Sequence, residues 1–99
     1  MGRVKLCLLF FLMIWVSVLN AQTTKVRGTV TDAETGEPLP MVTLLFVGTT
    51  IGVTTDFDGN YYLETRENVS ELMAAYVSYE KQTKPVNKGA FNTIDFKLV

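Results

Sequence analysis

The chain is short, close to neutral and rich in apolar residues. It has 99 residues, of which 47% are hydrophobic, nine Lys and Arg against ten Asp and Glu, one cysteine and no histidine. This charge balance excludes a basic surface for nucleic acid. The absence of histidine removes the usual general base and a usual zinc ligand.

The first 21 residues predict a signal peptide. Two basic residues precede the apolar run Leu6–Leu19, and the small residue Ala21 follows closely. The run has 14 residues, whereas a membrane-spanning helix needs about 20. We therefore expect cleavage after Ala21, with an uncleaved anchor as the alternative. The remaining domain, residues 22–99, has a net charge of −3 and contains no cysteine for a disulfide or a lipid anchor.

Short β-type segments separated by turn residues fill that domain. We predict strands at Val26–Thr31, Met41–Val47, Thr49–Thr55, Asn60–Thr65, two within Glu71–Val86, and one at Thr93–Val99. Many short strands at this spacing are typical of an all-β sandwich or barrel. The segment Met41–Val47 is nearly all apolar, which predicts a strand that is buried on both faces or crosses the core. Glu71–Ala75 could instead form a short helix, since its residues are good helix formers.

Alternation along the strands predicts which side chains enter the core. The core-facing residues that it indicates are Val26, Gly28, Val30, Tyr61, Leu63, Ile94, Phe96 and Leu98. The four tyrosines could form an aromatic binding surface. Packing in the core with the hydroxyl at the rim explains them more simply.

The segment Asp56–Gly59, with the sequence DFDG, lies between two predicted strands. Asp-Gly in this position is a strong signal for a β-hairpin. A calcium loop of the EF-hand type would also use Asp56, Asp58 and Asn60 as oxygen ligands, but it needs glycine where Tyr61 stands and helices on both sides. We therefore predict the tip of a hairpin. Asp56, Asp58 and Asn60 remain weak candidates for a metal site.

Catalysis has little support in the residues. Asp56 and Asp58 could act as the acid–base pair of a hydrolase, but a domain of 78 residues leaves little room for a substrate cleft. Ser70 and Ser78 have no evident base partner, and the domain lacks histidine and cysteine. We predict no catalytic residue, no cofactor and no enzyme activity.

The stretch VRGTVTDAETGEPLPMVTLLFVGTTIGVTTDFDGNYYL resembles the carboxypeptidase-regulatory-like domain. That family has the pattern G-x-V-x-D-x-x-T-G-x-P-L-x-x-V, then G-T, then T-D-x-x-G-x-(F/Y)-x-L. The matching positions are Gly28, Val30, Asp32, Thr35, Gly36, Pro38, Leu39, Val42, Gly48, Thr49, Thr55, Asp56, Gly59, Tyr61 and Leu63. The resemblance covers the whole of residues 22–99. Ser78 departs from it, because relatives often carry glycine there.

The resemblance implies a seven-stranded transthyretin-like β-sandwich that serves as an accessory module. The zinc domain that performs catalysis in carboxypeptidases is absent from this sequence. Similar domains stand at the N-terminus of exported Bacteroidetes proteins, often before the outer-membrane β-barrel of a TonB-dependent receptor. The implied location is the periplasm or outer membrane of a Gram-negative bacterium. The implied partners are other envelope protein domains, with no nucleic acid and with membrane association only through a larger protein.

Two further functions remain open from the sequence. The domain could be a free-standing secreted protein that binds carbohydrate or another protein through its tyrosines or loops. It could also be a hydrolase that uses Asp56 and Asp58. Fold alone does not decide between such functions.

Overall fold

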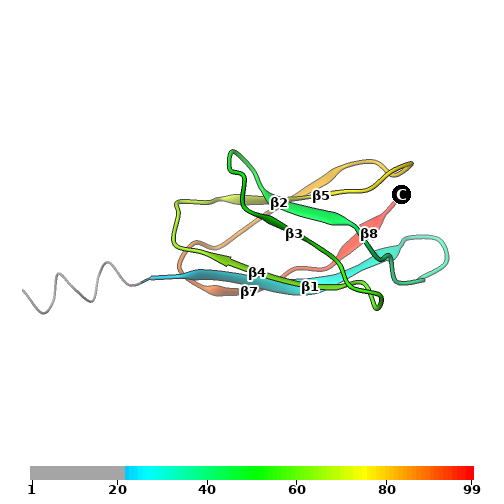
Figure 1. Ribbon diagram of the computed structural model, residues 1–99, viewed down its shortest axis with the longest axis horizontal. Coiled ribbons are helices and arrows are strands. Elements are labelled where there is room, and N and C mark those ends of the chain that lie inside the picture. Colours follow the sequence, from blue (N-terminus) through cyan, green and yellow to red (C-terminus); the bar gives the residue numbers. More distant parts are fainter. Residues whose placement is uncertain (1–21) are drawn as a thin grey trace, which may run out of the picture.

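The computed structural model describes residues 22–99, so the predicted signal peptide lies outside the described residues. The described chain folds into two stacked β-sheets (Figure 1). The strands are β1 (Thr24–Asp32), β2 (Thr43–Phe46), β3 (Gly52–Thr54), β4 (Asn60–Thr65), β5 (Glu71–Ala75), β6 (Gln82–Pro85), β7 (Phe91–Thr93) and β8 (Phe96–Leu98). Within this part there is no helix long and apolar enough to cross a membrane. The predicted all-β sandwich is confirmed.

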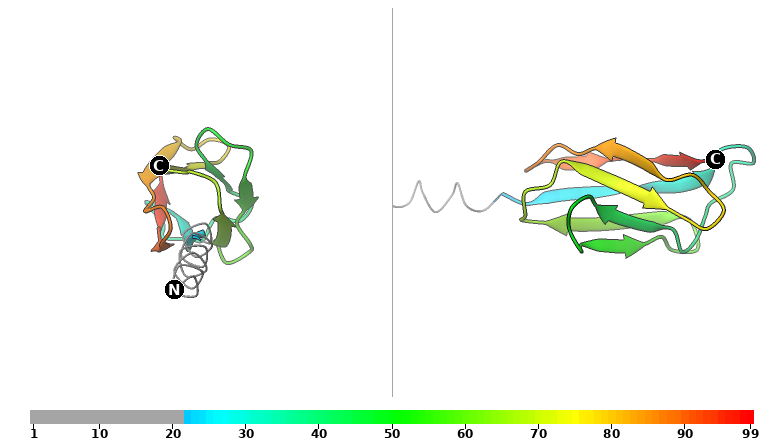
Figure 2. Two further views of the ribbon diagram at one scale, coloured as in Figure 1. Left: turned by 90° about the vertical axis from the view of Figure 1, so that its left-hand side faces the viewer. Right: turned by 90° about the horizontal axis from the view of Figure 1, so that it is seen from above.

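Each sheet has a defined strand order. The first sheet runs β4-β1-β7, with β8 also pairing with β1, and the second runs β3-β2-β5-β6. β1 is antiparallel to β4 but parallel to β7 and β8. The end-on view in Figure 2 shows the two layers enclosing the interior. β1 is therefore the central strand of its sheet, which agrees with its length of nine residues.

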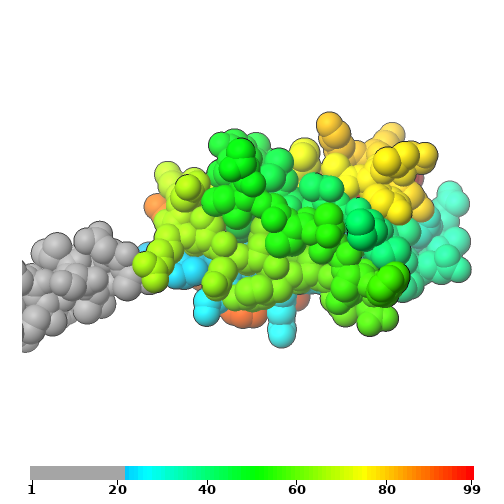
Figure 3. Space-filling model, in the orientation of Figure 1, coloured from blue at the N-terminus to red at the C-terminus, as the bar shows by residue number. Residues whose placement is uncertain are grey.

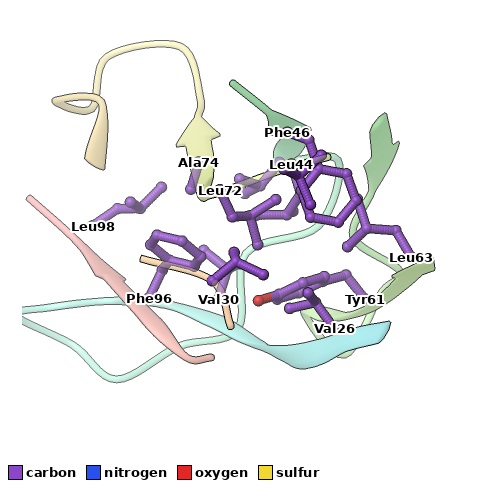
Figure 4. Close-up of a cluster of buried hydrophobic side chains, with 13 residues drawn as sticks. Val26, Val30, Leu44, Phe46, Tyr61, Leu63, Leu72, Ala74, Phe96 and Leu98 are labelled. Atoms are coloured by element: carbon purple, nitrogen blue, oxygen red, sulfur yellow. The ribbon is translucent and has the colours of Figure 1, made fainter. Parts of the chain in front are cut away.

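The core lies between the two sheets and follows the predicted alternation. Figure 4 shows side chains from both layers meeting there. The buried apolar residues are Val26, Val30, Val42, Leu44, Phe46, Tyr61, Leu63, Val69, Leu72, Ala74, Val86, Phe96 and Leu98. Of the eight predicted core-facing residues, Gly28 and Ile94 are only half-buried.

The prediction that Met41–Val47 is buried on both faces is wrong. Val42, Leu44 and Phe46 are fully buried, whereas Met41 and Thr43 are exposed. The molecule has only two layers, so the outer face of β2 meets solvent. The helix alternative for Glu71–Ala75 is also wrong, because these residues form β5 and pair with β2 and β6.

The predicted last strand, Thr93–Val99, is interrupted. β7 and β8 both pair with β1, but Ile94 and Asp95 between them leave the ladder. The Ile94 amide still donates to the Arg27 carbonyl at 2.9 Å, and its own carbonyl turns in over Gly28. This break raises the strand count from the predicted seven to eight and leaves Ile94 only half-buried.

The bend predicted near Ser78 is present, and it strains the backbone. Ser78 follows β5 with a φ of 71°, a conformation that glycine adopts at little cost.

We expect Ser78→Gly to raise the free energy of unfolding by about 0.5–1 kcal/mol, since relief of this strain exceeds the added freedom of the unfolded chain. Urea unfolding followed by far-UV circular dichroism measures the change. Ser78→Ala keeps the strain and serves as the control, so an equal gain in both variants would contradict this explanation.

Candidate functional site

The segment Asp56–Gly59 forms the predicted tight turn, and Asp56 holds it together. One oxygen of the Asp56 carboxylate accepts hydrogen bonds from the amides of Asp58 and Asn60, each at 2.9 Å. The Asp56 carbonyl accepts the Gly59 amide at 3.0 Å, and Gly59 has a φ of 75°. A side-chain oxygen that binds nearby amides in this way is typical of a turn-forming aspartate.

The prediction that this turn joins two strands of one hairpin is wrong. β3 lies in the second sheet and β4 in the first, so the turn connects the two layers. Thr55 explains the divergence, because its amide binds the Val42 carbonyl at 3.0 Å and keeps the chain on the second sheet. Four residues later the Gly59 carbonyl accepts the Val30 amide at 2.8 Å, which starts the pairing with β1.

Two of the three candidate metal ligands, Asp56 and Asn60, already have other contacts, and Asp58 is exposed. One oxygen of Asp56 is used within the turn, and the side-chain oxygen of Asn60 accepts the Thr29 hydroxyl at 2.8 Å. Across residues 22–99 no group of three or more His, Cys, Asp or Glu residues is arranged to hold a metal ion. The geometry of Asp56 is thus accounted for by its turn.

Asp32 joins the end of β1 to the loop between β5 and β6. One carboxylate oxygen accepts the amides of Glu34 and Thr35 at 2.8 and 3.0 Å, and the other accepts the Tyr79 hydroxyl at 2.6 Å. These hydrogen bonds, that of Tyr79 above all, hold the pKa of Asp32 below its ordinary value of 3.8. The same contact raises the pKa of Tyr79. The motif residue Asp32 is therefore a half-buried residue that ties two loops together by hydrogen bonds.

The hydrogen bonds of Asp32 predict a loss of stability in acid. Because folding lowers the pKa of this carboxyl, its contribution is present above pH 3.8 and disappears as pH falls through the lower folded pKa. We expect the urea midpoint to drop below about pH 4 and to drop less in Asp32→Asn. Urea titrations from pH 2 to 6 measure this. Asp58→Asn, which alters an exposed carboxylate in the neighbouring turn, should keep the drop seen in the unmodified chain.

The four tyrosines do not form one aromatic surface. Tyr61 is buried, its ring centre lies 6.5 Å from that of Phe96, and its hydroxyl donates to the Ile94 carbonyl at 2.5 Å. Burial is the main cause that raises the pKa of Tyr61. Tyr76 and Tyr79 pack against each other with ring centres 5.8 Å apart. Both are partly buried and also pack against the core, whereas Tyr62 is exposed on the outer face of β4. Core packing is therefore the correct interpretation for Tyr61 and, in part, for Tyr76 and Tyr79, but not for Tyr62.

An exposed apolar cluster beside the turn was missed by the sequence analysis. Phe57 is 92% exposed and Met41 is 66% exposed, and together with Pro40 they line a groove of 200 Å³. The turn that carries Phe57 protrudes at the lower right of Figure 3. The sequence contained one signal for this exposed cluster. An aromatic residue stands between the two aspartates of a predicted turn, where its side chain cannot pack against the core. Two large exposed apolar side chains side by side are typical of a surface that contacts another protein.

The family follows from a comparison of this sandwich with known proteins. The model of the CarboxypepD_reg-like domain matches residues 26–99, which include every strand of both sheets except the first two residues of β1. The chain belongs to the CarboxypepD_reg-like domain family. Four of the fifteen motif residues of this family member act in the turns and connections described above, namely Asp32, Thr55, Asp56 and Gly59.

Curated relatives of this CarboxypepD_reg-like chain are TonB-dependent receptors. It is 35% identical over 96 residues to TonB-dependent receptor P3 of Formosa agariphila, with 97% of this chain and 9% of the receptor aligned. It is 38% identical over 66 residues to TonB-dependent receptor SusC of Bacteroides thetaiotaomicron, with 67% of this chain and 6% of the receptor aligned. The chain thus spans less than a tenth of the length of these relatives.

Solved structures support the fold. A type II cohesin-X-dockerin complex from Acetivibrio cellulolyticus contains a chain with a TM-score of 0.52 and 20% identity, covering 74% of this chain and 52% of that one. A putative carbohydrate binding protein from Bacteroides uniformis gives a TM-score of 0.52 and 15% identity, covering 75% of this chain and 40% of that one. At these identities the likeness concerns the β-sandwich architecture alone.

Proposed function

We propose that this chain is a non-catalytic accessory module of a larger exported outer-membrane protein of the TonB-dependent receptor type. The observation that carries the proposal is the alignment of 97% of the chain with 9% of a TonB-dependent receptor. A module of this size within a far longer receptor makes contacts with neighbouring domains and does not form the transport path. Residues 1–21 act as the signal peptide that directs it to the periplasm.

The surface supports a role in contacts rather than in chemistry. The polar motif residues are engaged in turns, as Asp32 and Asp56 show. Phe57, the most exposed of the large apolar side chains, lies on a protruding turn and lines one groove with Met41. Such a cluster suits contact with another envelope protein domain, and the rest of the receptor is the nearest such partner.

Immunoblotting of native cell fractions with an antibody to residues 22–99 tests this proposal. We expect a band about ten times larger than this chain, in line with the 9% coverage of the receptor, in the outer-membrane fraction. N-terminal sequencing of the band should begin at Gln22. A band of about the size of residues 22–99 in the soluble periplasm or the medium would contradict the proposal and favour a free-standing binding protein.

A further inference from the structure

The edges of the two sheets differ in their protection against pairing with another strand. β4 forms one edge of the first sheet and β7 with β8 the other, while β3 and β6 form the edges of the second sheet. An open edge presents unpaired amide and carbonyl groups that can bind another chain. Proteins usually shield such edges with short strands, lysine, proline or irregular pairing.

Three of these edges are shielded. β6 contains Lys84 and Pro85, and β3 has only three residues. The edge made by β7 and β8 is interrupted between the two strands and is covered from the second sheet. There the Gln82 side chain donates to the Lys97 carbonyl at 2.5 Å, and the Lys84 ammonium donates to the Asp95 carbonyl at 2.6 Å.

β4 is the exception. Its six residues alternate regularly and include no proline and no lysine. The Val30 amide donates to the Gly59 carbonyl, so these two residues form a hydrogen-bonded pair. Hydrogen-bonded pairs alternate with non-hydrogen-bonded pairs along an antiparallel ladder, so the amides and carbonyls of Tyr61 and Leu63 point toward β1. The same groups of Tyr62 and Glu64 therefore face away from the sheet.

The outer side of β4 is also accessible. A groove of 510 Å³ lies between the end of β3 and the start of β4, and Thr54 and Tyr62 are among its lining residues. The surface that carries β3 and β4 faces the viewer in Figures 1 and 3. Asn60, which has the same orientation as Tyr62, already binds Asp56 through both its amide and its carbonyl. The free segment of the edge is thus Tyr62 to Glu64.

We propose that β4 pairs antiparallel with β4 of a second copy of this chain, about a two-fold axis at Leu63. In this register Tyr62 of each copy lies opposite Glu64 of the other, and the free groups form four backbone hydrogen bonds. A shift of the axis to Glu64 would place two carboxylates directly opposite each other. A shift to Tyr62 would require the groups of Asn60, which are already bound.

The side chains suit this register. Within one chain the Tyr62 hydroxyl donates to the Glu64 carboxylate at 2.9 Å. In the dimer, the Tyr62 hydroxyl of each copy also faces the Glu64 carboxylate of the other copy across the axis. Arg66 follows β4 and comes to lie opposite Asn60 of the other copy, close to the acidic turn Asp56–Gly59. The edge is therefore complementary to itself in charge and in hydrogen bonding.

Sedimentation equilibrium tests the proposal on protein purified from the periplasm after expression of the whole chain. We expect a concentration-dependent dimer between about 1 μM and 1 mM. Tyr62→Pro removes an outward amide without removing a bond to β1, and should weaken dimerisation at least about tenfold. Thr83→Pro removes the outward amide of β6 in the same way and should leave dimerisation unchanged.

Disulfide trapping tests the register. Residues 22–99 contain no cysteine, so Tyr62→Cys and Glu64→Cys can be made as separate variants. Opposite residues of a hydrogen-bonded pair have Cα atoms about 5.5 Å apart, which permits a disulfide. We expect a crosslinked dimer when the two variants are mixed, and little with either alone. A monomer up to 1 mM, a dimer that tolerates Tyr62→Pro, or no crosslink in the mixture would overturn the proposal.

Discussion

Gly28→Ala should lower the free energy of unfolding by about 4 kcal/mol, a large part of the stability of so small a domain. A methyl group at this position would overlap the carbonyl oxygen of Ile94 and would lie 3.0 Å from the Tyr61 ring. The carbonyl belongs to the backbone between β7 and β8, so it cannot move without loosening their pairing with β1. Urea unfolding followed by tyrosine fluorescence measures the change.

The neighbouring residue Thr29 supplies the control for Gly28→Ala. Thr29 faces away from the core, and Thr29→Ala keeps its backbone hydrogen bond to the Asp95 carboxylate at 2.9 Å. We expect this variant to lose about 1 kcal/mol or less. If Gly28→Ala and Thr29→Ala lowered the free energy of unfolding equally, the overlap of the new methyl group with the Ile94 carbonyl would not be the cause of the loss.

Gly59→Ala should cost about 3 kcal/mol, because two separate penalties add at this residue. The φ of 75° disfavours any side chain, and a Cβ atom would lie 2.6 Å from the Val30 carbonyl oxygen and 3.1 Å from the Pro38 Cβ. The result is a distorted Asp56–Gly59 turn and a weakened start of β4. Thermal unfolding followed by circular dichroism gives the magnitude.

Gly36→Ala separates these two penalties. Gly36 has the same φ of 75°, but a Cβ there would meet nothing within 4 Å. We expect Gly36→Ala to cost only the backbone penalty of about 1 kcal/mol. If Gly36→Ala lowered the free energy of unfolding as much as Gly59→Ala, the close contacts of the Gly59 position with Val30 and Pro38 would not contribute to the loss.

The fold could be predicted from the sequence where a local pattern has only one solution. Strict alternation placed Tyr61, Leu63, Phe96 and Leu98 in the core, and all four are buried. Asp-Gly in a short polar segment predicted a tight turn at Asp56–Gly59, and the turn is there. These signals act within a few residues, and the packing of the two sheets does not override them.

The remaining features depend on contacts between distant residues. Local pattern does not indicate that Thr55 binds Val42 and so directs β3 and β4 into different sheets. The apolar run Met41–Val47 does not reveal that a two-layer molecule leaves one of its faces in solvent. The contact of Asp32 with Tyr79 spans 47 residues. At the candidate site, the tight turn at Asp56–Gly59 was predicted correctly, but the hydrogen-bond partners of its residues and the neighbouring exposed Phe57 were not.

The parallel pairing of β1 with β8 has a mechanical consequence. Both strands run in the same direction, so Thr24 and Leu98 lie at opposite ends of the sandwich (Figure 1). Traction applied between these two residues would slide β1 along β7 and β8 and load their hydrogen bonds together, instead of opening them one at a time. Tension along the length of the sandwich would therefore meet these hydrogen bonds in shear.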